Sequence, residues 1–368
     1  MSSEFTIVIP YYAISETIDF VKRQLNYYHF NPTPMTVILA VSGDEIATVE
    51  LEQFIKGLND SRFVMFTTEE TDITNMESWL IKIFDGLKRV TTPYVVINGA
   101  DDVVIPEAAH KGTDVLANNL DTAAVKGHTV YFDNNSGKLL ISEDLDILDD
   151  CPINRLKDVM EYRDSFFYII RRTKDLVREF ENIVGLSKKP KNFHKSSYHL
   201  EHFNILSIAA LGKVYVFKLP WRIQISHKNN STSYSQHGFD RIELGALDMA
   251  NYQKFKSGNI NMQGLSYAHY KFLWVYNQIK QTSLTLEQIG YRYIYKSFRP
   301  IIFARIFTYF LLHKIFIFSK KLSSNESMYL NNPESFFKTE EYSLLKKYYF
   351  SAENIKLIES KNNIKCKS

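Results

Sequence analysis

Residues 94–106 read YVVINGADDVVIP. An apolar run passes through small residues and ends in two adjacent carboxylates, Asp101 and Asp102, after which apolar residues resume. A continuous apolar run bounded in this way is typical of a strand that is buried on both faces of a sheet. Two like charges side by side repel, so one of them would have a raised pKa unless a partner compensates the charge. The stretch therefore predicts a buried strand that carries two carboxylates to the edge of a sheet.

Upstream of this stretch, short apolar runs alternate with segments of helical periodicity. In residues 15–28, for example, Ile18, Val21, Leu25 and Tyr28 share one helical face. Uniformly apolar short strands with helical crossovers indicate a parallel sheet that is covered on both faces. The expected strands are 5–10, 35–41, 62–66 and 94–98, and the expected helices are 15–28, 45–58 and 76–90.

Polar residues follow three of these strands directly. They are Tyr11-Tyr12, Ser42-Gly43-Asp44 and Asp101-Asp102. Ligands of parallel α/β sheets bind at the carboxyl ends of the strands, so we expect these residues to converge on one edge. Lys82, on the helix that precedes the fourth strand, is expected on a solvated face, although it could reach a phosphate.

The carboxylate pair is suited to a divalent cation. Hard oxygen ligands are preferred by Mg²⁺ and Mn²⁺, and Mg²⁺ usually takes one or two protein carboxylates and leaves the other positions to phosphate oxygens and water. Gly99 and Ala100 leave room for a bulky ligand to approach the backbone. The alternative is that Asp101 and Asp102 only terminate the strand and cap the next segment.

Beyond Pro106 the pattern is less regular. Gly212 follows the helix expected at 199–211 and is a common helix stop. We expect a catalytic domain over 1–240 and a helical C-terminal region over 241–368, in which the apolar and basic segment 297–321 either lies in a membrane interface or packs on protein. The other expected elements are strands at 123–132, 166–170 and 213–217, a helix at 173–183, an acidic loop at 136–152 and a basic loop at 185–197.

Composition narrows the class of protein. The chain has 368 residues, of which 45% are hydrophobic and 23% charged, so a sizeable core is possible. The net charge of +3 gives no reason to expect a nucleic-acid partner. Two cysteines, Cys151 and Cys366, fit neither a zinc site nor a disulfide framework and point to a reducing compartment. The N-terminus reads as a strand rather than a signal peptide, and no uncharged apolar stretch reaches 18 residues. We therefore expect a cytoplasmic protein, either free or at the inner face of the cytoplasmic membrane.

Several phrases in order resemble the GT-A glycosyltransferases, in particular their bacterial family-2-like branch. They are IVIPYY at the first strand, VSGDE after the second, and TPYVVINGADDVVIP around the carboxylates, followed by YHLEHFNIL and GKVYVFKLPWRIQISHKNNSTS. The resemblance covers roughly residues 5–235. The sequence departs from the family in having SGDE where the family has a DDGS pattern. It also has Ala100, preceded by Gly99, where the family places a further aspartate, so the metal motif is ADD followed by Val103.

The resemblance implies roles at a nucleotide-sugar site. Pro10, Tyr11 and Asp44 would flank the nucleotide base and ribose. Either Tyr11 or Tyr12 would stack on the base, and the alternative for each is a core tyrosine. These positions form the base-binding half of the implied site.

On the diphosphate side, the resemblance implies that Asp101 and Asp102 hold the metal and the ribose–diphosphate. His227 would approach the metal or the diphosphate from the far side. Arg222 or Lys228 would add positive charge at the leaving group. The alternative for His227 is a surface loop histidine.

On the acceptor side, Glu201 would be the general base that deprotonates a hydroxyl; the alternative is an exposed helical glutamate. One base with a metal-held leaving group gives an inverting transfer. The leading hypothesis is therefore a metal-assisted transferase that moves sugar from a nucleotide sugar to a glycan or lipid-linked acceptor in bacterial surface polysaccharide synthesis, with oligomerisation left open. The alternatives are a degenerate binding or scaffold subunit, and a nucleotidyltransferase. The nucleotidyltransferase is disfavoured because that class usually has a glycine-rich, basic phosphate loop after the first strand, and PYYAISET contains neither glycine nor a basic residue.

Overall fold

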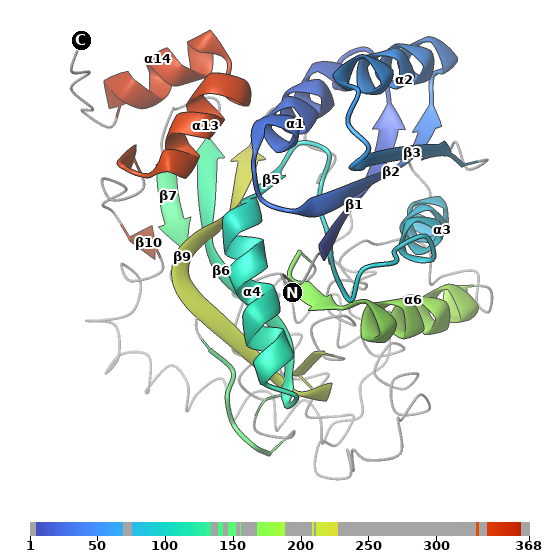
Figure 1. Ribbon diagram of the computed structural model, residues 1–368, viewed down its shortest axis with the longest axis vertical. Coiled ribbons are helices and arrows are strands. Elements are labelled where there is room, and N and C mark those ends of the chain that lie inside the picture. The colour runs from blue at the N-terminus through green and yellow to red at the C-terminus, as the bar shows by residue number, and fades with distance from the viewer. Residues whose placement is uncertain are drawn as a thin grey trace, which may run out of the picture.

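The computed structural model describes the chain over ten ranges, namely 5–68, 76–133, 139–142, 146–151, 155, 168–187, 208–209, 211–226, 329–330 and 337–361. These ranges contain a sheet of ten strands with helices on both sides (Figure 1). The first four strands of the sequence form the parallel part of this sheet, and later strands extend the sheet.

The first hundred residues form the alternating strands and helices that the sequence predicts. β1 pairs in parallel with both β2 and β4, and β2 pairs in parallel with β3. The strand order in this part is therefore β4-β1-β2-β3. The bounds are β1 Phe5–Ala13, α1 Ile18–Phe30, β2 Met35–Gly43, α2 Glu45–Leu58, β3 Phe63–Thr67, α3 Met76–Leu87 and β4 Tyr94–Ile97.

Each side of this sheet buries a different set of side chains. Ile7 and Ile9 of β1 point into the core that α1 and α2 cover, while Val8 points into the core under α3 and α6 (Thr173–Ser187). Alternate residues of a strand face opposite sides of the sheet, which is why a strand between two helical layers is apolar throughout. The face predicted for α1 is buried as expected, including Val21 and Leu25.

Antiparallel strands extend the sheet beyond β4. β8 (Ile170–Arg172) lies between β4 and β6 (Thr122–Asp133) and is antiparallel to both. β9 (Lys213–Ser226) pairs in parallel with β6 and antiparallel with the short β5 (Val103–Val104). It is one strand of 14 residues, much longer than the expected 213–217. β5 is followed by α4 (Pro106–Asn118), whose first residue is a proline, as helix starts favour.

Two expectations for this region are wrong in detail. The segment expected as an acidic loop contains β7 (Leu139–Ser142), which pairs with β6 and with β10 (Tyr329–Leu330). Three apolar residues are enough for pairing once a neighbouring strand is available. The strand expected at 166–170 begins only at Ile170.

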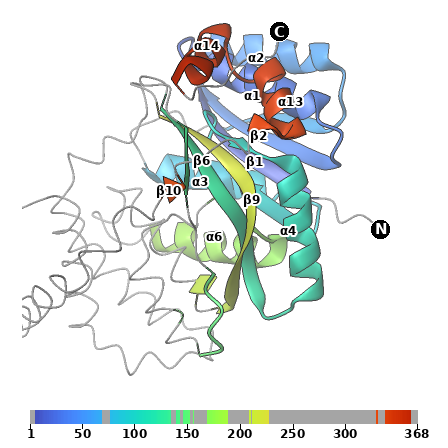
Figure 2. The same cartoon turned by 90° about the vertical axis from the view of Figure 1, so that its left-hand side faces the viewer.

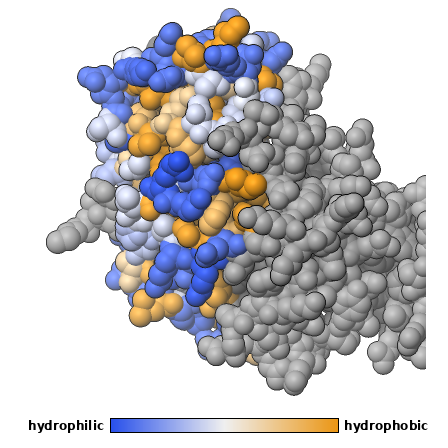
Figure 3. Space-filling model, turned by 90° about the vertical axis from the view of Figure 1, so that its right-hand side faces the viewer, coloured by the Kyte–Doolittle hydropathy of each residue, from blue (hydrophilic) through white to orange (hydrophobic). Residues whose placement is uncertain are grey.

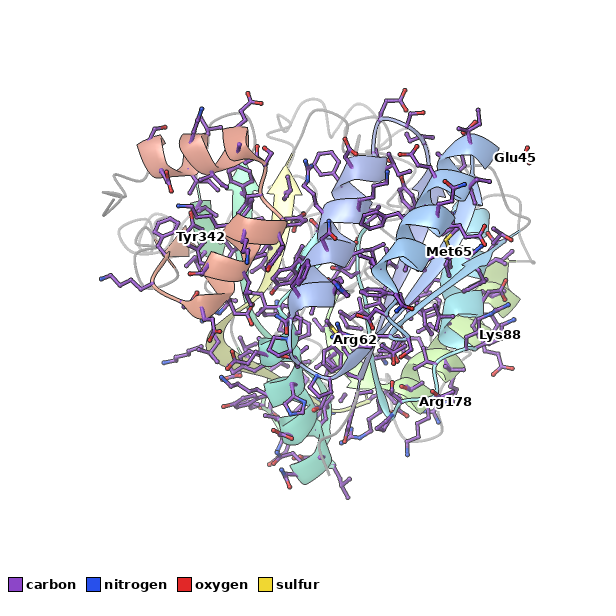
Figure 4. The ribbon with its side chains drawn as sticks, turned by 45° about the horizontal axis from the view of Figure 1, so that its top comes forward. Glu45, Arg62, Met65, Lys88, Arg178 and Tyr342 are labelled. Atoms are coloured by element: carbon purple, nitrogen blue, oxygen red, sulfur yellow. The ribbon has the colours of Figure 1, made fainter. Side chains whose placement is uncertain are left out.

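The last two helices of the described ranges share a core with the N-terminal strands. α13 (Glu340–Tyr348) contacts α1, and α14 (Ala352–Lys361) follows it; Figure 1 shows α13 beside α1 and α14 beyond it. Figure 2 shows α13 and α14 from the side. Buried residues of α13 and α14, such as Leu345 and Ile358, belong to the same core as β1 and β2. Tyr342, labelled on α13 in Figure 4, is 5% exposed. Residues 337–361 of the expected C-terminal region thus share a core with the expected catalytic domain, and the boundary near residue 240 stays a prediction.

The surface over the described residues is mixed in character, with polar and apolar residues interspersed on the face in Figure 3. Among the helices in the described ranges, none combines the length and hydropathy that a membrane crossing requires.

Candidate functional site

A topological switch point lies between β1 and β4. The connection after β1 leads to β2 on one side, whereas β4 lies on the other, so the order reverses between them; ligands of open α/β sheets bind at such a point. β4 pairs with β1 only as far as Val8↔Ile97, while β1 continues to Ala13 beside β2. Pro10 therefore lies beyond the β4 pairing, where its missing N–H leaves no gap in the β1–β4 ladder.

The residues after β4, 98–102, form what we call the carboxylate turn. Its backbone carbonyls are held by buried side-chain amides. Asn98 Nδ2 donates to the carbonyls of Gly99, at 3.1 Å, and Asp102, at 2.9 Å. Gln24 Nε2, from α1, donates to the same two carbonyls. Gln24 and Asn98 are both fully buried, so their amides cannot replace the hydrogen bonds to the turn by hydrogen bonds to water. The two amides therefore hold the turn in place.

Asp102 points into the protein and forms an ion pair. Its Oδ2 accepts a hydrogen bond from Arg222 of β9, and its Oδ1 accepts one from the Ile225 N–H at 3.1 Å. The two side chains of the pair are 7% and 6% exposed. Burial raises the pKa of the Asp102 carboxyl to about 6, and the charge of Arg222 opposes that rise. The Arg222 guanidinium also stacks on the ring of Tyr168, 3.7 Å from its centroid.

Asp101 is placed differently from its neighbour. Its side chain is partly exposed at the outside of the turn. Gly99 brings the two carboxylates together: a Cβ at that position would lie 3.0 Å from Asp101 Oδ1 and also 3.0 Å from Asp102 Oδ2. The structure thus divides the pair into a buried, ion-paired Asp102 and a more accessible Asp101. Arg222, which the resemblance places at the leaving group, is paired with Asp102, and its role at the leaving group stays a prediction.

Sequence reasoning missed one residue of the site. The Tyr349 hydroxyl, just after α13, donates to the Asp101 carbonyl at 2.8 Å. Tyr349 is 2% exposed. The aromatic run YYF at 348–350 ends an amphipathic helix and gives no local signal of this contact, because its partner lies 248 residues earlier in the chain.

The two tyrosines after the apolar part of β1 lie on opposite faces of the sheet. Tyr11 is 3% exposed, and its hydroxyl bonds to Thr17 Oγ1 at 3.1 Å and to the Ile14 carbonyl. Its environment is that of a core tyrosine. Tyr12 is partly exposed and faces Lys82, whose Nζ lies 5.6 Å from the ring centroid. Tyr12 is therefore the better placed of the two for stacking on a planar ligand.

The turn after β2 begins a helix. Gly43 has a φ of 118°, and a Cβ there would lie 2.5 Å from the Ala13 carbonyl oxygen, so only glycine lets β2 close against β1 at this point. Asp44 is exposed, and its Oδ1 accepts from the Ala47 N–H as the N-cap of α2. This cap is compatible with the ribose contact expected of Asp44, which stays a prediction.

Lys82 is not on a solvated face, contrary to expectation. It is 5% exposed, and its Nζ donates to the Tyr11 carbonyl at 3.1 Å and to Ser42 Oγ. The ammonium group ties the ends of β1 and β2 together. A buried cation thus lies at the edge of the sheet where the sequence predicts phosphate or nucleotide.

The remaining predicted residues lie outside the described ranges. They are Glu201, His227 and Lys228, together with the segments 188–197 and 297–321. Within the described residues, no group of three or more histidine, cysteine, aspartate or glutamate side chains lies together. The part of the site that the structure describes is therefore the carboxylate turn, its support and the ends of β1 and β2.

Comparison with known proteins identifies the fold. No protein-family model matches the chain. No curated protein matches its sequence. Among solved structures, TarS 1–349 from S. aureus has a TM-score of 0.50 at 12% identity, covering 78% of this chain and 77% of that one. The same protein in complex with UDP-GlcNAc also gives 0.50, at 11% identity and 78% coverage of each chain. The mannosyltransferase PcManGT from Pyrobaculum calidifontis, in complex with GDP-Man and Mn²⁺, reaches only 0.45 at 12% identity, over 98% of this chain and 87% of that one, and supports nothing further.

These identities establish similarity of fold and nothing finer. The expectation of a mixed α/β sheet with flanking helices and helices near the C-terminus is confirmed. The structural neighbours are glycosyltransferases, and the chain has their GT-A-like fold.

Proposed function

We propose that this protein transfers a sugar from a nucleotide-sugar donor to a glycan or lipid-linked acceptor. The observation that carries the proposal is the different placement of the two aspartates in the carboxylate turn. Asp102 is fixed by Arg222, and Asp101 is left partly exposed beside a glycine, at the point of the sheet where the strand order reverses. The GT-A-like fold supports the reading, because it belongs to glycosyltransferases.

The residues of the turn fit a divalent cation held together with a diphosphate. Asp101 offers hard carboxylate oxygens, and a cation such as Mg²⁺ needs few protein ligands when phosphate oxygens and water supply the rest. Asp102 is buried and paired, whereas Asp101 is partly exposed, so we assign direct contact to Asp101. Asp102 then keeps the turn in place. The metal role expected of Asp102 stays a prediction, and so does that of His227. When bound, the cation would stabilise the negative charge that develops on the departing diphosphate.

The chemistry needs an acceptor-side base opposite the leaving group. We assign this role to Glu201, as the sequence predicts. The acceptor oxygen forms a bond to the anomeric carbon while the bond from that carbon to the diphosphate oxygen breaks. The electron pair leaves with the diphosphate, and the acceptor proton passes to Glu201. Attack from the face opposite to the leaving group inverts the anomeric centre.

The first test is calorimetric titration of the full chain with UDP, GDP and CMP, each with and without Mn²⁺. UDP is the first nucleotide to try, because TarS was solved with UDP and with UDP-GlcNAc. We expect one nucleotide to bind in a metal-dependent manner, and Asp101→Asn to remove the metal dependence. Asp114→Asn, which removes an exposed charge on α4, is the matched control and should bind as wild type does. Binding that is equal with and without Mn²⁺ would remove the role given to Asp101.

A second test separates binding from turnover. Glu201→Gln should bind the nucleotide sugar with wild-type affinity and lose transfer by about a hundredfold or more, as expected when a general base is removed. The first acceptors to test in this transfer assay are glycans of bacterial surface polysaccharides.

Contact of 297–321 with a membrane is tested by sedimentation of the chain with anionic lipid vesicles. A chain that stays in the supernatant contradicts this contact.

The alternative of a degenerate binding subunit also has a specific observation in its favour. Ala100 stands where the family places a further aspartate, and at the neighbouring Gly99 a Cβ would crowd both existing carboxylates. A degenerate protein would bind nucleotide or glycan without turnover, and Glu201→Gln would change nothing. Hydrolysis or transfer of a bound nucleotide sugar by the wild-type chain excludes this alternative.

A further inference from the structure

The contact between Tyr349 and the carboxylate turn joins two distant parts of the chain. The Tyr349 hydroxyl donates to the Asp101 carbonyl at 2.8 Å, and the tyrosine is almost fully buried. Burial, together with the nearby charges of Asp102 and Asp101, raises its pKa well above the ordinary value. The hydroxyl therefore keeps its proton and acts as a donor. The contact is a fixed feature of the interior rather than an exposed side-chain bond.

The helix before Tyr349 is anchored independently of the turn. The Tyr27 hydroxyl of α1 donates to Glu341 Oε2 at 2.6 Å, and the rings of Phe30 and Tyr348 stack with centroids 4.2 Å apart. Thr339 caps α13 by accepting from the Tyr342 N–H. These contacts hold α13 against α1, as Figures 1 and 4 show, and bring Tyr349 to the turn.

Side chains from three parts of the fold hold the carbonyls of the turn. Gln24 of α1 and Asn98 after β4 hold those of Gly99 and Asp102, and Tyr349 holds that of Asp101. Fixing a carbonyl fixes the plane of its peptide group and restricts the ψ dihedral of that residue, on which the direction of its Cα–Cβ bond relative to this plane depends. We assign the Asp101 carboxylate to the ligand, so the hydrogen bond from Tyr349 affects where the Asp101 carboxylate oxygens lie.

We propose that Tyr349 is a positioning residue for Asp101, and that its hydrogen bond to the turn couples the end of α13 to binding of a divalent cation and nucleoside diphosphate there. The inference rests on the proposed function for the identity of the ligand. It assigns to the C-terminal helices a part in assembling the site, beyond their share of the core.

Two variants separate positioning from simple stability. Tyr349→Phe removes only the hydroxyl that reaches Asp101. Tyr27→Phe removes only a hydroxyl that crosses the same interface to Glu341, away from the turn. Both should melt below wild type. Only Tyr349→Phe should weaken binding of UDP in the presence of Mn²⁺, by about tenfold, the loss expected when a buried acceptor is left without its donor. GDP or CMP replaces UDP if wild type binds that nucleotide instead.

Hydrogen exchange tests the same idea without any ligand. In Tyr349→Phe, backbone amides of 98–104 should exchange faster than in wild type, while Tyr27→Phe leaves them unchanged. Coupling is reciprocal, so in wild type Mn²⁺ with the bound nucleotide should slow exchange in 340–348 as well. Tyr349→Phe should lose that protection.

The outcomes are distinguishable. Wild-type exchange at 98–104 in Tyr349→Phe overturns the inference whether or not a nucleotide binds. Equal weakening of nucleotide binding in both variants also overturns it, because the effect would then follow stability alone. If wild type binds no nucleotide, the proposed function fails, the coupling to ligand fails with it, and the exchange data alone decide whether Tyr349 fixes the turn.

Discussion

Replacing Asp102 by asparagine tests the buried ion pair directly. Asparagine keeps an oxygen for the Ile225 N–H, and it replaces the oxygen that accepts from Arg222 by an NH2 group, so both the charge and that acceptor are lost. Arg222 is then a buried cation without its carboxylate, and breaking a buried pair in this way costs about 3–5 kcal/mol. With an m-value of about 3 kcal/mol/M in urea, the unfolding midpoint should fall by about 1 M or more.

The assay is urea denaturation followed by tryptophan fluorescence and by circular dichroism at pH 8, well above the Asp102 pKa of about 6, so that the carboxyl is ionised. Arg222→Met and the double variant complete the cycle. Removing both charges should restore about 2 kcal/mol or more of what Asp102→Asn loses, because no isolated buried charge remains. Asp101→Asn, at the partly exposed position, should change stability by less than about 1 kcal/mol.

Either of two results would refute the reasoning. A midpoint for Asp102→Asn equal to that of wild type would mean that Arg222 is not held by the charge of Asp102. A double variant less stable than Asp102→Asn would mean that Arg222 contributes chiefly by packing, for instance on Tyr168. Without a single cooperative transition seen by both probes, the free energies themselves would not be defined.

Three further perturbations follow from the described contacts. Gly43→Ala should destabilise by about 1–3 kcal/mol, measured by thermal melting, because its Cβ would clash with the Ala13 carbonyl at a positive φ; a wild-type melting temperature would contradict this. Lys82→Met should cost about 1–3 kcal/mol by leaving buried acceptors unpaired, and Lys82→Arg is the control that keeps the charge. The hydrogen bonds from Arg62 hold the pKa of Asp60 well below its ordinary value, so their stabilisation is present above pH 4 and is lost as pH falls further; Asp60→Asn should show a flatter acid limb in stability against pH, and an unchanged limb would exclude the effect.

Much of the parallel half of the fold could be predicted from the sequence, because its signals are local. The helix expected at 45–58 is α2, with the same bounds, and the apolar residues of β1 and β2 are buried as the strand pattern indicates. A buried strand needs an apolar run, and a covering helix needs an apolar face, and both can be read from a few neighbouring residues.

The errors come from partners that lie far away in the sequence. Periodicity places a lysine such as Lys82 in solvent, whereas acceptors from β1 and β2, the Tyr11 carbonyl and Ser42 Oγ, make its burial possible. The sequence does not predict β7, because its short apolar run lies among acidic residues. The strand forms because it pairs with β6. In the site, the pairing of two aspartates could be predicted, but the sequence does not show that Asp102 turns inward to Arg222.

The bond from Tyr349 also bears on the order in which the protein forms. Its two partners are 248 residues apart, and Arg222 and Asp102 are 120 apart. Contacts that close long loops form late, because the entropy cost of closing the loop comes before the stabilisation that the contact gives. During synthesis, β1 to β4 can pair while most of the chain is still to be made. The turn is thus built early and completed last, so nascent or truncated chains that stop before residue 349 would hold a sheet without a finished site.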